Sequence, residues 1–303
     1  MTKINEKINS GGIKVLSLYD GISCGRIALE RAGIPVDRYV AYEIEDSAIA
    51  ISKHNWNNIE YCGDVYAADF SKYKGFDLLI GGSPCTYWSV ARKDRETTSD
   101  GIGFELFKQY VRALKESGCK YFLYENNYSM HKDIKAEITR YLGVEPIMIN
   151  SSLVSAQSRK RLYWTNIPGI QQPKDKNILL KDIIEHGKVD RDKSLCVTRR
   201  YAGFRGSQSY LCRRYFGKSM GQAIFEGQID EIKDKWKEDP YFESNESNIR
   251  QMTLRECERL QTLPDFYTDA DGVSTQMKYE AIGNGWTVDV IAWIFGFLNE
   301  NGE

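Results

Sequence analysis

The sequence predicts an α/β fold built on a mainly parallel, doubly wound sheet. Short apolar runs alternate with segments of helical periodicity over residues 14–141, and polar residues repeatedly follow the apolar runs. The composition, 42% apolar and 27% charged, is that of a globular domain able to bury its own core. Alternating strands and helices favour a parallel sheet with helices on both faces. Ligands of such sheets bind beyond the carboxyl ends of the strands, so residues there are the first candidates for function.

The predicted elements follow one another at short intervals. A strand over 14–19 leads through a glycine turn into a helix over 23–32, and a second strand occupies 39–42. Next come a helix over 47–55, a strand over 77–80, a helix over 104–117, a strand over 121–124 and a helix over 134–141. Apolar spacing separates strands from helices. Polar groups stand at the expected sheet edge in Asp20-Gly21, Glu43, Asp64, residues 81–89 and Glu125-Asn126-Asn127.

Charge and cysteine content exclude several classes of protein. The net charge of -1 argues against general coating by a polyanion, although 41 Lys and Arg leave room for a local basic patch. Seven cysteines without a CxxC pair, and a start without an apolar signal segment, predict a reduced, cytoplasmic protein. The longest apolar run, 288–298, is shorter than the roughly 20 residues of a membrane span. The three histidines are scattered, so we expect no metal site and no Ser/His triad.

A basic, aromatic insert interrupts the alternation between about residues 166 and 250. Residues 188–218 hold nine Lys or Arg and two acidic residues, interleaved with Tyr, Phe and Gly, whereas acidic residues dominate 226–246. Regular patterning returns at 253–260 and in the last helix. A charge run is commonly a solvated face. Basic residues among aromatic ones also suit phosphate contacts and insertion into a nucleic acid groove.

Three strand ends carry groups suited to a nucleotide-like ligand. The turn LYDGISCG lets the backbone approach a ligand and precedes a helix with free N–H groups. Glu43 suits a ribose diol, and Asp64 can accept from an adenine amino group. Each of these features, taken alone, is more commonly an ordinary structural turn.

Cys85 and Glu125 are more specific candidates for catalytic residues. Cys85, in GGSPCTYWS, follows two glycines and a proline after an apolar strand, so its thiol is expected in a loop at the sheet edge. A buried, inert cysteine is the alternative. Glu125 ends the next strand in FLYENN. A thiol and a carboxylate at neighbouring strand ends can converge on one substrate.

The ordered motifs resemble those of the DNA (cytosine-5) methyltransferases. They are LYDGISCG, YEIED, CGDV, GGSPCTYWS, YENN, AQSRKRLYW, RECERLQTLPDFY and AIGNGWTVDV. Their order and spacing are those of the family, their wording is closest to the catalytic domain of the animal de novo enzymes, and only the insert is unmatched. The resemblance implies a class I S-adenosylmethionine-dependent methyltransferase fold, Rossmann-like, with a small target-recognition lobe. Because no reader domains are attached, we expect a bacterial or phage member.

The resemblance also implies a domain organisation and a set of site residues. Residues 1–167 form the catalytic domain, 168–251 the target-recognition region, and 252–303 a segment that completes the catalytic domain. Cys85 attacks the cytosine ring, Glu125 assists at the ring nitrogen, Arg161 and Arg159 form the basic pair near the flipped base, and Asn126 holds the loop around it. S-adenosylmethionine is the implied cofactor, and its expected contacts are Tyr19, Asp20, Gly21, Ile22, Gly25, Glu43, Asp64, Val65, Pro84, Asn284 and Trp286.

The insert is interpreted as the DNA-recognition region. The expected DNA contacts are Ser89, Arg199, Arg200, Arg205, Arg213 and Arg214. Because the target base must leave the stack, loops in the insert and near Trp88 are expected to fill the vacated space.

Two positions depart from the family pattern. Asn127 stands where the motif has a valine, and Thr86-Tyr87-Trp88-Ser89 replaces the commoner wording after the nucleophile. Three interpretations of Asn127 stay open: its amide faces water, it binds a polar group on a modified donor or cytosine, or it marks lost activity.

The favoured function is methyl transfer to carbon 5 of cytosine in double-stranded DNA. The alternatives are a tRNA cytosine-5 methyltransferase, because Cys196-Val197-Thr198 is similar to that subfamily's Cys-Phe-Thr element, a variant using a modified donor or modified cytosine, and a catalytically silent DNA-binding homologue. Thr198-Arg199 also fits the entry to a DNA-recognition lobe. We expect a monomer when free, with double-stranded DNA and, in a restriction-modification setting, a restriction endonuclease as partners.

Overall fold

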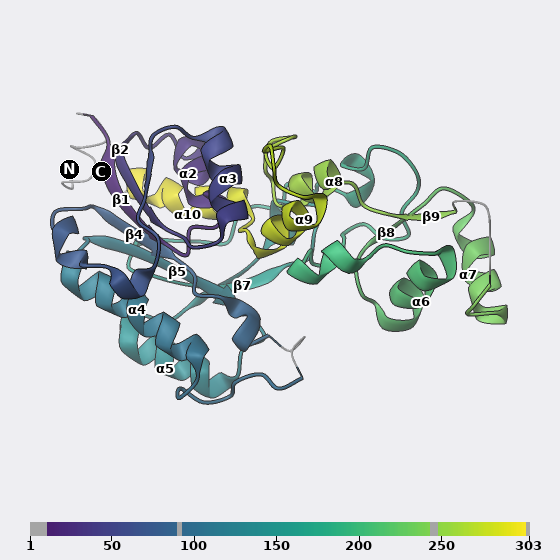
Figure 1. The fold of residues 1–303 in the computed structure, drawn as a ribbon, viewed down its shortest axis with the longest axis horizontal. Coiled ribbons are helices and arrows are strands. Elements are labelled where there is room, and N and C mark those ends of the chain that lie inside the picture. The colour runs from purple at the N-terminus through teal and green to yellow at the C-terminus, as the bar shows by residue number, and fades with distance from the viewer. Residues whose placement is uncertain (1–10, 90–92, 243–247, 301–303) are drawn as a thin grey trace. The chain divides into compact units, whose positions relative to one another are not determined.

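The computed structural model describes residues 11–89, 93–242 and 248–300 (Figure 1). Its contacts divide the chain into two compact units. The first comprises Met1–Asn150, Lys160–Gln172 and Val290–Glu303, and the second comprises Ser151–Arg159 and Pro173–Asp289. The chain therefore leaves the first unit and returns to it twice. The functional division at residues 167 and 251 stays a prediction.

The first unit is built on a seven-stranded sheet. Its strands are β1 (Ile13–Leu18), β2 (Val36–Tyr42), β3 (Ile59–Tyr61), β4 (Leu78–Gly81), β5 (Tyr121–Asn127), β6 (Ile147–Asn150) and β7 (Lys160–Thr165). They lie in the order β3-β2-β1-β4-β5-β7-β6, and β7 is antiparallel to both neighbours while the other pairs are parallel. The order reverses between β1 and β4, so their carboxyl ends border the place where ligands bind in open sheets.

Helices cover both faces of this sheet, as the alternation predicts. Figure 1 shows α4 (Ile102–Ser117) and α5 (Lys132–Leu142) on one face, and α2 (Cys24–Arg31), α3 (Asp46–Asn55) and α10 (Val288–Glu300) on the other. Asn299 in α10 donates its amide to the carbonyl of Ala32, which caps α2, over 2.9 Å. The last segment of the chain thereby completes a layer that the first helix begins.

An aromatic cluster fixes β5 under α4. Tyr124 of β5 lies 5.1 Å from Phe107, 4.9 Å from Tyr110 and 5.8 Å from Trp164, measured between ring centroids. All four side chains are buried. Aromatic pairs add about 0.5 to 1.5 kcal/mol each beyond the burial of their area. The strand that carries Glu125 is therefore held rigidly from one face.

The sheet differs from the predicted one in three strands and two boundaries, since β2 begins at Val36 instead of Tyr39 and β5 ends later than predicted. β3, β6 and β7 are absent from the prediction, because β3 has three residues and the other two lack a long apolar run. β5 extends through Asn127 instead of ending at Tyr124, because β7 pairs with it antiparallel and supplies partners for its polar end. Glu125, Asn126 and Asn127 are thus part of the strand and not of the loop after it.

The second unit contains α6 (Gln208–Lys218), β8 (Ala223–Phe225), α7 (Ile229–Glu238), β9 (Ile249–Gln251), α8 (Leu254–Leu260) and α9 (Thr275–Asn284). β8 and β9 form an antiparallel pair. Tyr201, Phe204 and Tyr215 from the basic insert are 3%, 1% and 3% exposed and belong to this unit's core. The prediction that the aromatic residues of the insert are free for groove insertion is wrong for these three, because burying large rings is what gives the unit a core.

The described residues contain neither a single membrane-spanning helix nor a cluster of metal ligands. No single helix there is both long and apolar enough to cross a membrane, although α9 and α10 together meet those criteria as a bent pair. In that part of the chain no three His, Cys, Asp or Glu side chains cluster so as to hold a metal ion.

Candidate active site

The turn after β1 has an unusual backbone. Tyr19, Gly21 and Ser23 have φ angles of 58°, 58° and 59°, in the left-handed region that only glycine adopts without strain. Asp20 stabilises the turn, because its carboxylate accepts hydrogen bonds from the hydroxyls of Ser17, Ser23 and Tyr39. Burial raises the pKa of the Asp20 carboxyl, and these hydroxyl donors oppose that shift. The carboxylate thus shapes the turn from within.

Glu43 joins the ends of β1 and β2. Its Oε2 accepts from the backbone N–H of Gly21 over 2.8 Å, and its Oε1 accepts from those of Ile44 and Glu45 over 2.8 and 2.9 Å. The predicted donor-binding residues Gly21 and Glu43 are therefore in direct contact. Ile22 and Gly25, predicted with them, are buried where α2 begins.

Asp64 and Val65 follow β3 in a short 3-10 helix. Asp64 accepts from the N–H of Tyr66 over 2.9 Å, and Val65 is 3% exposed. Arg112 of α4 fixes this segment, donating to the carbonyls of Val65 and Ala68 over 2.6 and 2.9 Å. Arg112 was not among the predicted residues, because nothing in its local sequence separates it from other helix-surface arginines.

Exposed apolar side chains lie beside these strand-end acids. Ile44, next to Glu43, is 69% exposed, and Tyr66, close to Asp64 in sequence, is 53% exposed. Pro84, after β4, is also exposed. Apolar surface beside hydrogen-bonding carboxylates fits a nucleoside, whose base has apolar faces and whose ribose has two hydroxyls. Ile44 and Tyr66 were not among the predicted residues, although an apolar residue soon after a strand-end acid is a usable signal.

Cys85 lies at the carboxyl edge of the sheet, as predicted. It opens a 3-10 helix, Cys85–Tyr87, directly after Pro84, and its side chain is half-buried. Its carbonyl accepts from the N–H groups of Trp88 and Ser89 over 3.1 Å each. The alternative of a fully buried, inert cysteine does not fit this position.

Asn126 holds the loop that leads to Cys85. Its Nδ2 donates to the carbonyl of Ser83 over 3.1 Å and to the hydroxyl of Tyr124 over 3.3 Å. The hydroxyls of Ser83 and Tyr124 also lie 2.7 Å apart. Asn126 is 1% exposed. The end of β5 therefore fixes the backbone just before the thiol, and the role predicted for Asn126, holding the loop around the base, stays a prediction.

Glu125 and Arg161 form an ion pair. Register places Asn127 opposite Arg161 and Glu125 opposite Tyr163, so these four side chains share one face of the sheet. Arg161 Nε lies 3.0 Å from Glu125 Oε1, and the two side chains are 14% and 11% exposed. A carboxylate so confined has a defined orientation.

Asn127 lies buried between this pair and the cysteine loop. It is 5% exposed, its Nδ2 donates to the carbonyl of Cys85 over 3.3 Å, and its Oδ1 accepts from the hydroxyl of Ser129 over 3.1 Å. The interpretation that the amide faces water is therefore wrong, because a buried amide needs partners inside the protein.

Trp88 is not available for insertion into DNA as it lies in this structure. The indole is 0% exposed, and its Nε1 donates to Glu96 over 3.2 Å. Glu96 also accepts from the N–H of Gly103 at the start of α4 over 3.1 Å. Burial and the Glu96 contact stabilise the Trp88 side chain under α4. That loops near Trp88 fill the vacated space stays a prediction.

Arg159 lies in the second unit and holds a turn. Its guanidinium donates to the carbonyls of Val197, Gly285 and Gly283 over 2.7, 2.9 and 3.3 Å, and the residue is 4% exposed. Asn284 and Trp286, predicted to bind the donor, are on this turn, exposed and half-buried respectively. The structure therefore gives Arg159 a turn-holding role that the prediction did not include.

Gln261 supports the same turn. Its Nε2 donates to the carbonyls of Ile282 and Gly285 over 2.9 and 3.0 Å, and its Oε1 accepts from Gln157 over 2.8 Å. A Cβ at Gly283 would lie 2.3 Å from the backbone nitrogen of Arg199, so only glycine allows this close approach. Gln261 was missed as a functional candidate, because its partners are far away in sequence.

The predicted DNA-contacting arginines lie in the second unit, on the segment 199–205 and on α6. Arg199 pairs with Glu280 over 2.7 Å, and Arg200 and Arg205 are exposed. The guanidinium of Arg213 lies over the rings of Tyr210 and Tyr241, at 5.8 and 5.1 Å. Ser89, the remaining predicted DNA contact, belongs to the first unit.

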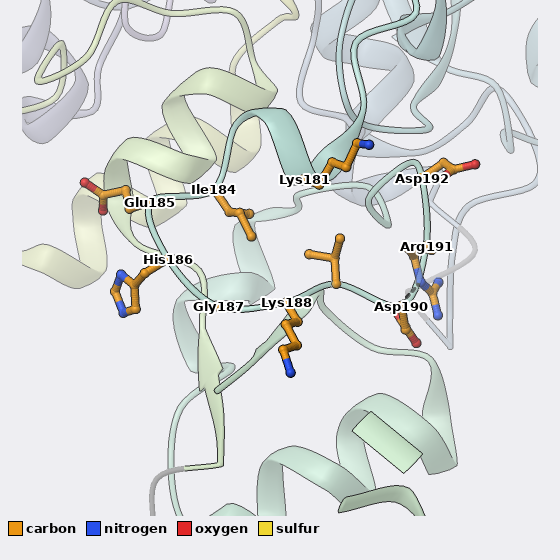
Figure 2. A pocket seen from close by; sticks show the side chains of 10 residues that line it. Lys181, Ile184, Glu185, His186, Gly187, Lys188, Asp190, Arg191 and Asp192 are labelled. Atoms are coloured by element: carbon orange, nitrogen blue, oxygen red, sulfur yellow. Dashed lines mark hydrogen bonds and ion pairs between the residues drawn. The ribbon is translucent and has the colours of Figure 1, made fainter. Parts of the chain in front are cut away.

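A pocket of about 590 Å³ lies in the second unit, and none of the residues that line it is a predicted site residue (Figure 2). Its lining comes from one stretch of chain, with Glu185 and His186 at one end and Asp190 and Arg191 at the other. Asp190 accepts from Arg191 over 3.2 Å, and Glu185 pairs with Arg255 over 3.0 Å. The charges are thus mixed and paired within the protein, and we assign the pocket no role.

A family model described as C-5 cytosine-specific DNA methylase matches residues 13–194 and 171–299. The chain belongs to this family. The orphan methyltransferase M.SPRI of Bacillus phage SPR is 34% identical over 198 residues, which cover 59% of this chain and 44% of that protein. M.Rho11sI of Bacillus phage rho11s is 29% identical over 254 residues, covering 78% of this chain and 47% of that protein. The matched part of this chain spans less than half the length of each of these two relatives.

Solved structures agree with the family assignment at the level of the fold. The S. pombe Dnmt2 methyltransferase has a TM-score of 0.69 at 17% identity, covering 96% of this chain and 100% of that chain. A putative DNA modification methyltransferase encoded within an E. coli prophage has a TM-score of 0.61 at 19% identity, covering 95% and 99%. The predicted class I methyltransferase fold is confirmed.

Proposed function

We propose that this protein transfers a methyl group to carbon 5 of cytosine in double-stranded DNA through a covalent adduct on Cys85. The observation that carries the proposal is the end of β5, where Asn126 and Asn127 hold the backbone around Cys85 while Glu125 pairs with Arg161. A nucleophile and an acid on one rigid frame are what addition to a pyrimidine requires.

Each residue has a defined task in this chemistry. Carbon 5 is a poor nucleophile until the Cys85 thiolate adds to carbon 6 and places electron density on carbon 5. Glu125 in its protonated form donates a hydrogen bond at the ring nitrogen and stabilises the charge that addition creates. Arg161, 3.0 Å from Glu125, orients that carboxyl group. After methylation, loss of the carbon 5 proton expels the thiolate and frees the product.

The proposed cofactor is S-adenosylmethionine, which when bound supplies an electrophilic methyl on a sulfonium. The turn 19–23, Glu43 and the Asp64-Val65 segment would hold it, with Ile44 and Tyr66 offering apolar surface to the base. The hydrogen bonds that arrange these groups within the first unit support the assignment. Asn284 and Trp286 remain proposed contacts from the second unit.

The proposed target is DNA, recognised by residues 168–251. The cluster of arginines on 199–205 and α6 supports this assignment, because phosphate contacts need cations on a surface. The tRNA alternative rests on Cys196-Val197-Thr198. In this element Val197 is 1% exposed and donates its N–H to Gln157 over 3.2 Å, Cys196 is half-buried and Thr198 is exposed.

A trapping experiment tests the proposal. A DNA duplex containing 5-fluorocytosine cannot lose a proton from carbon 5, so the adduct should persist on a denaturing gel when S-adenosylmethionine is present. We expect a stable adduct for the native protein and for Cys62→Ser, which changes an exposed cysteine, and none for Cys85→Ser. An equal adduct for Cys85→Ser would refute the assignment. An adduct with 5-fluorocytosine RNA but not with DNA would show that the substrate is RNA and not DNA.

A further inference from the structure

Asn127 is engaged at both ends of its amide. Nδ2 donates to the carbonyl of Cys85 over 3.3 Å, and Oδ1 accepts from the hydroxyl of Ser129 over 3.1 Å. Its backbone N–H donates to Asn126 Oδ1 over 2.8 Å. A valine, which the family motif has at this position, offers no side-chain donor or acceptor. This chain therefore has a link between β5 and the nucleophile that a valine cannot make.

The same short segment also holds the far side of the cysteine loop. Arg95 donates to the carbonyl of Ser129 over 2.7 Å. Cys85 and Arg95 are thus both bound to the stretch from Asn127 to Ser129, one through a side-chain amide and the other through a guanidinium.

Because of the β5–β7 register, the hydrogen bond from Asn127 to Cys85 also relates Cys85 to Glu125. Glu125 and Asn127 are two residues apart on β5 and share a face, with Arg161 opposite Asn127. The Cys85 carbonyl is one bond from its α-carbon. The hydrogen bond from Asn127 therefore fixes the backbone of the nucleophile relative to the Glu125-Arg161 pair.

We propose that Asn127 is a positioning residue that holds Cys85 in register with Glu125 before DNA binds. This inference rests on the proposed function and deepens it. Preorganising a nucleophile raises the rate of the addition step without adding any contact to DNA or donor, because the geometry is set in advance. The interpretation that Asn127 binds a polar group on a modified donor or a modified cytosine stays a prediction.

The test is a single-turnover measurement of adduct formation on the 5-fluorocytosine duplex, with dissociation constants for DNA and S-adenosylmethionine measured in parallel. We expect Asn127→Val to slow the adduct about tenfold while both dissociation constants stay within about twofold of native. Asn127→Asp, which has the same shape but lacks the Nδ2 donor, should lose as much. Ser129→Ala, which leaves that donor intact, should lose about threefold or less.

Controls separate the possible failures. Asn55→Val removes an amide that donates to the carbonyl of Ile51 over 2.8 Å at the end of α3, and it should leave the rate unchanged. A native protein without any adduct would overturn the proposed function, and this inference with it. A native adduct matched in rate by Asn127→Val would overturn the inference alone, as would a rate loss explained entirely by weaker DNA binding. If Asn127→Val fails to fold, Asn127→Asp decides.

Discussion

The end of β5 and the turn between α9 and α10 are both held in place by side-chain donors, but the donors come from different parts of the chain. Both present predicted site residues, and both are fixed by buried side chains that donate to backbone carbonyls. At β5 the donors are Asn126 and Asn127, consecutive residues of a single strand. At the turn the donors are Arg159 and Gln261, which come from segments far apart in sequence.

At β5 the site residues are positioned by the register of one strand pair, whereas at the turn they are positioned by hydrogen bonds from several separate elements. At β5 one register determines which side chains face each other, so Glu125, Asn127 and Arg161 share a face by geometry alone. At the turn each carbonyl is held by a donor whose position depends on a separate element. Substitution at β5 should therefore alter chemistry with a modest loss of stability, and substitution at the turn should do the reverse.

The largest effect is expected at β5. Glu125→Gln keeps the size of the side chain and removes the acid, so we expect kcat to fall by about 10² to 10⁴. The midpoint of urea unfolding should move little, because the aromatic cluster under α4 is untouched. Steady-state methylation of duplex DNA measures the first quantity and circular dichroism the second. A loss of activity below tenfold would remove Glu125 from the reaction.

The two arginines of QSRKR sharpen the comparison. Arg159→Met leaves three buried carbonyls without their charged donor, and we expect the free energy of unfolding to fall by about 3 to 5 kcal/mol. Arg161→Met removes one close, partly buried ion pair and should cost about 1.5 to 3 kcal/mol while lowering kcat more strongly. Urea titrations of both variants, with kcat for each, test the contrast. Equal losses of unfolding free energy in the two variants would contradict the expectation that the turn depends more on its buried donor than β5 does.

A smaller effect is expected on the arginine surface of the second unit. Arg205→Glu combined with Arg213→Glu should weaken DNA binding about ten- to a hundredfold at moderate salt and reduce the slope of log K against log salt by about two. Arg214 is left unchanged because its Nε is buried. Lys233→Glu with Lys235→Glu on α7 reverses the same charge and should have little effect. Fluorescence anisotropy at several salt concentrations measures the DNA affinity of both double variants. Equal weakening by both would mean that the protein's net charge, and not the position of these arginines, determines binding.

The parts that were predictable from sequence are those governed by local periodicity and by strand ends. The alternation predicted both helical layers, and the strand-end rule brought Cys85, Glu125, Glu43 and Asp20 to one edge of the sheet. These predictions depend on neighbours in sequence, where an apolar run and the polar residue after it are visible together.

The remainder depends on long-range partners. The extension of β5 through Asn127 follows from pairing with β7, a strand whose sequence begins with two charged residues. Trp88 reads as an exposed loop aromatic until Glu96 and α4 are seen to enclose it. Arg159 and Arg161 look equivalent in QSRKR, yet they belong to different units. No local pattern carries this information.

The position of α10 bears on how the chain acquires its structure. The helix that packs beside α2 is encoded at residues 288–300, and Asn299 reaches Ala32 across 267 positions of sequence. A ribosome therefore releases the whole second unit before the first has its final helix. During that interval the carbonyl of Ala32 at the end of α2 lacks the donor that Asn299 supplies in the folded protein. Closing so long a loop adds little entropy beyond a shorter one but slows the search for the native contact. We therefore expect the first unit to mature last, although most of it is made first.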